Sequence, residues 1–271
     1  MVRRLIFPHV SHETKKTVSR AILITGNARS GTTIAGKIIG ACKDCEYFFE
    51  PELLFSLFAI IDKIPKDAWK LLFETYVGED LLGKAVIGRN VNLRQSDDSS
   101  FYNTKSKSEY NNRIKIPGCR SNVQKRIKQK IPVIKIPDII PFLYIFQKYY
   151  PQIKIIICRR DFNNTFKSIK KKKWYHSSAK KGYVWPSYEI KGCEIPFWVQ
   201  QKEWVNWPVM STENRIVLNT FSNKITADLK YIEFNYDKLI NSKKQCLSFL
   251  KKLKIKPTKK TTENIKAFRK H

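Results

Sequence analysis

The sequence predicts an α/β fold with a P-loop-like parallel sheet flanked by helices on both faces. Apolar runs bounded by turn residues are typical of buried strands, and they occur at residues 21–26, 131–136, 153–158 and around 229–235. Helical patterns lie between or after these runs, at residues 32–43, 51–62, 66–77, 138–149, 162–174, 212–226 and 242–254. Because strands alternate with helices, the sheet should be parallel, and a ligand should bind beyond the carboxyl ends of its strands.

Length and composition favour a single domain over residues 1–271, since 42% of the residues are hydrophobic and can form a substantial core. Two stretches interrupt the alternation and are expected to be inserted loops. Residues 89–122 are polar and predict a mobile loop, whereas residues 174–208 are dense in aromatic side chains. The Lys-rich sequence after Lys251 predicts a frayed helix and a disordered end.

The chain shows no apolar run of signal-peptide or membrane-spanning length, so we expect a soluble, cytoplasmic protein; its oligomeric state is left open. The net charge of +29 favours anionic ligands in general, but the lysines are spread along the chain and are equally consistent with codon bias. Only Cys42 and Cys45 have the spacing of a metal or redox site, and the four histidines supply no spaced partners. We therefore predict no metal site.

The turn after the first predicted strand, GNARSGTT, carries the features of an anion-binding loop. Gly26 and Gly31 let the backbone turn tightly, so that N–H groups point inward at the start of the helix. Thr32 and Thr33 add hydroxyl donors, and Arg29 adds a forked, permanently charged contact. The loop departs from G-x-x-x-x-G-K-[ST], because Thr32 stands where nucleotide triphosphatases have a lysine.

A second motif follows the third strand in YPQIKIIICRRDFNNTFKSI. Arg160 stands at the strand end, and Ser168 follows eight residues later on the next predicted helix. This pair is suited to hold a second phosphate. The alternative is an Arg–Asp pair, with Asp161, and an unrelated surface serine.

Together the two motifs resemble those of the PAPS-dependent sulfotransferases, where PAPS is adenosine 3′-phosphate 5′-phosphosulfate. Ala28 to Thr33 is similar to the family's 5′-phosphosulfate loop, [RK]-S-G-[TS]-[TS], with Arg29 at the basic position. Ile157 to Ser168 is similar to its 3′-phosphate motif, although Phe162 replaces the proline of R-D-P.

Three weaker similarities follow in the family's order and extend the resemblance over most of the chain. Phe49 to Pro51 resembles the "EP" segment of glycan-type members, and Ile134 to Asp138 resembles the K-x-P stretch of bacterial members. Phe234 to Leu239 resembles the "Y-E-D-L" strand end.

The resemblance implies transfer of a sulfuryl group from PAPS, as co-substrate, to a hydroxyl acceptor by in-line displacement. It assigns donor binding to Asn27, Ala28, Arg29, Ser30, Gly31, Thr32, Thr33, Arg160 and Ser168. Arg29 and the loop N–H groups would also stabilise the charge that grows on the leaving oxygens.

The catalytic base is expected to be Glu50, which follows a β-like segment and has the family's Glu at its position. Glu50 could instead be a carboxylate that merely favours the start of a helix. His176 is the rival base. Lys135 could tune the base or contact the sulfuryl group.

The aromatic insertion predicts where the acceptor binds, because sugar faces stack on rings. Its rings include Trp185, Tyr188, Trp198, Trp204 and Trp207. We expect a carbohydrate or glycolipid acceptor, with core packing as the alternative role of these rings. Two rival functions are a P-loop small-molecule kinase, which the missing lysine disfavours, and a basic nucleic-acid-binding protein; we expect no nucleic-acid partner.

Overall fold

Five strands form the central sheet in the order β2-β3-β1-β4-β7, and every neighbouring pair is parallel. The strands are β1 (Ile22–Gly26), β2 (Cys45–Phe49), β3 (Ile131–Lys135), β4 (Lys154–Arg159) and β7 (Ile232–Asn235). The computed structural model describes residues 8–175, 186–190, 192–222 and 228–268. The predicted α/β class and parallel sheet are confirmed.

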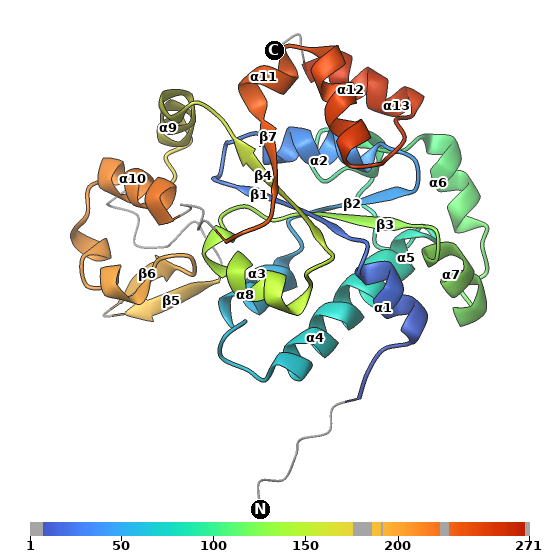
Figure 1. Cartoon of the computed structure of the whole chain (residues 1–271), viewed down its shortest axis with the longest axis horizontal. Helices are drawn as coiled ribbons and strands as arrows, with labels where there is room; N and C mark the ends of the chain where they lie inside the picture. The colour runs from blue at the N-terminus through green and yellow to red at the C-terminus, as the bar shows by residue number, and fades with distance from the viewer. Residues whose placement is uncertain (1–7, 176–185, 191, 223–227, 269–271) are drawn as a thin grey trace, which may run out of the picture.

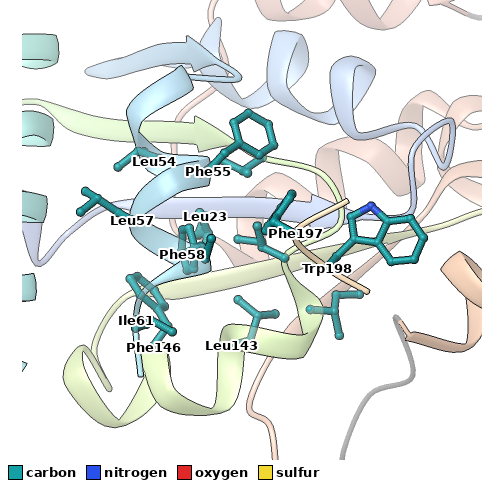
Figure 2. Close-up of a cluster of buried hydrophobic side chains, with 14 of the residues drawn as sticks. Leu23, Leu54, Phe55, Leu57, Phe58, Ile61, Leu143, Phe146, Phe197 and Trp198 are labelled. Carbon is teal, nitrogen blue, oxygen red and sulfur yellow. The ribbon is translucent and has the colours of Figure 1, made fainter. Parts of the chain in front are cut away.

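Helices cover both faces of this sheet (Figure 1). One face carries α2 (Thr32–Gly40), α12 (Lys243–Lys252) and α13 (Lys259–Phe268), and the other carries α1 (His12–Val18), α3 (Glu52–Ala59), α4 (Lys66–Glu74) and α8 (Leu143–Tyr149). Side chains of β1 alternate between the two cores, as strand geometry requires. Leu23 belongs to the larger cluster, part of which is shown in Figure 2, and Ile22 and Ile24 belong to the cluster under α2.

Shorter elements complete the described chain. The label η marks a π-helix in η1 and 3-10 helices elsewhere. Between α4 and β3 lie η1 (Thr75–Leu82), α5 (Gly83–Ala85), η2 (Phe101–Asn103), α6 (Lys107–Ile114) and α7 (Arg120–Ile127). Later come η3 (Ile140–Phe142), α9 (Phe162–Lys171), the antiparallel hairpin β5 (Ser187–Ile190) and β6 (Cys193–Pro196), η4 (Gln201–Glu203), η5 (Trp207–Val209), α10 (Thr212–Ser222) and α11 (Tyr236–Ile240). None of the described helices has both the length and the apolar character needed to cross a membrane.

The polar stretch 89–122, expected to be a loop, contains η2, α6 and the start of α7. Buried charge ties it to the sheet. Arg113 of α6 donates to both carboxylate oxygens of Glu46 on β2, at 2.6 and 3.0 Å, and both side chains are 4% exposed. Burial raises the pKa of Glu46, but the charges of Lys105 and Arg113 lower it more, so the net pKa lies below its usual value.

The end of the chain also differs from the expected frayed tail, because α13 packs against α2. Ile265 is 2% exposed within the core under α2. The side-chain amide of Asn264 donates to the carbonyls of Lys37 and Asn103, both at 2.9 Å. Long-range contacts thus fix a helix whose own sequence is rich in lysine.

Candidate functional site

A cavity of about 520 Å³ opens at the carboxyl ends of β1, β2, β3 and β4. Its wall holds more cations than carboxylates among the described residues: Arg29, Lys37, Lys135, Arg160 and Lys172 against Glu50, Asp98 and Asp138. Such a concave surface with an excess of positive charge concentrates anions. The cavity is therefore the candidate site for the phosphate compound that the sequence predicts.

The loop between β1 and α2 forms one wall, and two glycines set its shape. Gly26 has φ 146°, and a Cβ there would lie 2.5 Å from the carbonyl oxygen of Cys158. Gly31 has φ 97°, and a Cβ there would lie 2.4 Å from the ring of Tyr236. Only glycine fits both the backbone angle and the space.

Five of the seven loop residues assigned to the donor line the cavity: Ala28, Arg29, Gly31, Thr32 and Thr33. Thr32 and Thr33 open α2, so their N–H groups belong to the first turn, which has no intrahelical acceptors. Asn27 and Ser30 are not in the described wall. The Asn27 amide instead donates to Asn219 Oδ1 at 3.0 Å.

The second motif lies directly beside this loop. Arg29 Nε donates to Ser168 Oγ at 3.0 Å, and Arg160 Nη1 donates to the Arg29 carbonyl at 3.5 Å. The Arg160 guanidinium lies 4.6 Å from the centre of the Tyr236 ring. Its Nε is buried and has no hydrogen-bond partner among the described residues. The two predicted phosphate-binding motifs therefore lie side by side, although Arg160 lines the cavity and Ser168 is not among the described residues of its wall.

Glu50 and Lys135 form an ion pair in the cavity wall, at the ends of β2 and β3. Glu50 follows β2 with φ 46°, and its N–H donates to the Lys135 carbonyl at 2.9 Å. The Lys135 side chain is 5% exposed and that of Glu50 is 24% exposed. Burial lowers the pKa of Lys135, and the Glu50 charge partly opposes that shift.

Two solved structures with similarity to this chain are sulfotransferases. They are the sulfotransferase STF1 from Mycobacterium tuberculosis H37Rv (14% identity, TM-score 0.44, covering 94% of this chain and 73% of that one) and the sulfotransferase domain of the Synechococcus PCC 7002 olefin synthase (16% identity, TM-score 0.40, covering 89% and 75%). No protein-family model and no curated protein matches the sequence. The roles of individual residues therefore depend on the site itself.

Sequence reasoning missed several residues of the wall. Lys37 lies four residues after Thr33 on α2, which places both on one helix face, and its Nζ pairs with Asp98 at 2.7 Å. That spacing could have revealed Lys37. Asp98 and Tyr236 come from distant segments, and no local pattern marks them.

The aromatic insertion contributes differently from the prediction. Trp198 and Trp207 are 1% and 3% exposed in the larger core, where Figure 2 shows Trp198, so for them the core-packing alternative is correct. Tyr188 and Trp204 pack on each other, with ring centroids 4.7 Å apart. Trp185 and the rival base His176 lie outside the described residues. The aromatic part of the wall comes instead from Phe49, Phe55, Trp174, Tyr175, Phe197, Tyr236 and Phe268.

Cys42 and Cys45 are both buried. Burial raises the pKa of Cys42 to about 11 and that of Cys45 to about 12. Burial therefore disfavours the thiolate form of both side chains, which is the form that attacks a disulfide.

Proposed function

We propose that the protein is a sulfotransferase that moves the sulfuryl group of PAPS to a hydroxyl acceptor. One observation carries the proposal: Arg29 of the loop contacts both Ser168 and Arg160 of the second motif. Two neighbouring cationic motifs suit a ligand with two separate anionic groups. PAPS carries its phosphosulfate and its 3′-phosphate at different positions of one nucleoside.

The described residues fit such a donor. Arg160 lines the cavity, and a guanidinium presents a fork of donors that matches phosphate oxygens. A 3′-phosphate beside Arg160 and Ser168 would supply the acceptor oxygens. Arg29 and the hydroxyls of Thr32 and Thr33 would hold the 5′-phosphosulfate without the lysine of nucleotide triphosphatases.

When bound, PAPS supplies an electrophilic sulfur and a phosphate leaving group. Arg29 and the first-turn N–H groups of α2 would stabilise the charge on the leaving oxygens. Glu50 would take the proton of the acceptor hydroxyl, and its ion pair with Lys135 holds the carboxylate in the wall. Lys135 would neutralise charge on the transferred group.

We also propose that the acceptor is a carbohydrate or a glycolipid, which would bind to other aromatic rings than the sequence predicts. Phe49 and Trp174 are half-buried and lie in the same cavity wall as Glu50. Flat apolar rings next to a carboxylate suit the face of a sugar whose hydroxyl reaches Glu50.

Calorimetry with two nucleotides tests the donor. Adenosine 3′,5′-bisphosphate should bind more tightly than ADP, because only the bisphosphate reaches Arg160 and Ser168. Equal or tighter binding of ADP would contradict the proposal. Magnesium-dependent ATP turnover would instead favour the kinase, and salt-sensitive nucleic-acid binding without a preference for the bisphosphate would favour the third function.

A further inference from the structure

A chain of hydrogen bonds connects the phosphate loop to α10. The Ala28 N–H donates to Asp138 Oδ1 at 3.2 Å, and the Asn219 amide donates to the same oxygen at 3.1 Å. The Asn27 amide donates to Asn219 Oδ1 at 3.0 Å. The Asp138 N–H donates in turn to the Gly26 carbonyl at 3.0 Å. Three consecutive loop residues are thus bonded to one Asp–Asn pair.

Both members of the pair are removed from water. Asp138 is 4% exposed and Asn219 is 0% exposed. Buried polar groups are stable only where hydrogen bonds replace water, so these contacts are strongly preferred over alternatives. Asp138 also has φ 60°, an uncommon angle for a residue other than glycine, and such strain persists only where the surroundings enforce it.

Helix α10 also contacts the aromatic part of the molecule. Arg215 lies one turn before Asn219 on α10, so both point to similar sides of the helix. Its guanidinium donates to the Trp207 carbonyl at 2.9 Å and to the carbonyl of Tyr175, a residue of the cavity wall, at 3.5 Å. Helix α10 therefore contacts both the donor loop and the wall beside Glu50.

We propose that Asp138 and Asn219 are positioning residues that fix the phosphate loop and connect it to the aromatic wall. The inference rests on the proposed function for the identity of the ligand. Asp138 accepts a hydrogen bond from the N–H of Ala28, the residue before Arg29, and so sets where the Arg29 backbone enters the cavity. Neither residue needs to touch the donor to control its affinity.

Removing the Asn219 amide without changing the charge tests this role. Asn219→Leu has a side chain of similar size and loses both the bond to Asp138 and the bond from Asn27. Asp138→Asn is the conservative counterpart, because its amide oxygen can accept from both Ala28 and Asn219, as Asp138 Oδ1 does.

We expect Asn219→Leu to weaken adenosine 3′,5′-bisphosphate about tenfold or more, and Asp138→Asn to stay within about threefold of wild type or to bind more tightly. Asn214→Leu is the matched control, because it makes the same change at an exposed position of α10. Its affinity should equal that of wild type.

Unchanged affinity in Asn219→Leu, or a tenfold loss in Asp138→Asn, would overturn the inference. Should Asn219→Leu fail to fold, the smaller change Asn219→Ser, which also removes the amide that donates to Asp138, takes its place. A wild-type protein that prefers ADP would overturn the proposed function instead. The same variants would then be compared with ADP, which also occupies the loop, so the two failures are distinguishable.

Discussion

Arg29 and Ser168 are 139 residues apart in the sequence, and Arg29 Nε donates to Ser168 Oγ at 3.0 Å. The contact brings the loop after β1 against α9, which follows β4, the neighbouring strand. Because parallel neighbours end at the same edge, the two predicted anion-binding motifs lie side by side. Arg160 contacts the loop through the Arg29 carbonyl.

Arg160→Ala should weaken adenosine 3′,5′-bisphosphate roughly 10- to 100-fold, the value of one or two charge-assisted hydrogen bonds. ADP should lose much less, since it lacks the 3′-phosphate. Arg159→Ala is the matched control, because Arg159 is 49% exposed and pairs with Glu233. Titration calorimetry measures all four affinities, and an equal loss for both nucleotides would refute the 3′-phosphate role.

Glu50→Gln should lower kcat about 100-fold or more, because the amide cannot accept the hydroxyl proton. Binding of adenosine 3′,5′-bisphosphate should not change. Glu52→Gln, an exposed neighbour at the start of α3, should turn over like wild type. Single-turnover transfer from PAPS checks both variants. Retained turnover in Glu50→Gln would place the base elsewhere.

Gly31→Ala should both destabilise the fold and weaken phosphate binding, since the added Cβ meets the Tyr236 ring and the φ of 97° strains any other residue. Gly192→Ala isolates the strain. Gly192 has φ 71° and open space around it, so its substitution should cost only the backbone strain of about 1–2 kcal/mol. Urea unfolding should therefore show a larger loss for Gly31→Ala, and an equal loss would argue against the ring contact.

Glu46 should make stability depend on acid pH. Its pKa in the folded protein lies below the unfolded value of about 4.3, so the ionised form contributes stability at neutral pH. That contribution should be lost as the pH falls below about 4.3 through the lower folded pKa. The stability difference between wild type and Glu46→Gln, from urea unfolding, should shrink over this range. Glu189→Gln, at an exposed position, should show no such trend.

The fold was predictable where apolar runs are continuous. Residues 21–26, 131–136 and 153–158 correspond to β1, β3 and β4, because strands buried on both faces need apolar side chains at every position. The polar helix α6 was not predictable in this way. Its Arg113 is buried only because Glu46 neutralises it, and such a pairing across 67 residues leaves no local periodicity.

The candidate site also contains residues that the sequence predicts and residues that it does not. Gly26, Arg29 and Gly31 could be recognised in the sequence, because a tight turn with a predicted anion site requires these residue types close together. Asp138 and Asn219 could not be recognised in this way, because each hydrogen-bonds to a partner at least 81 residues away. Aromatic density was also ambiguous, because the same side chain can fill a core, as Trp198 does, or face a ligand.

Phe268, near the end of α13, lines the cavity. A group fused directly after α13 would therefore begin beside the candidate site. Helix α1, near the other end of the chain, lies across the sheet from α13 (Figure 1). Purification, surface immobilisation and crystallisation with nucleotides are accordingly better served by fusions at the amino terminus.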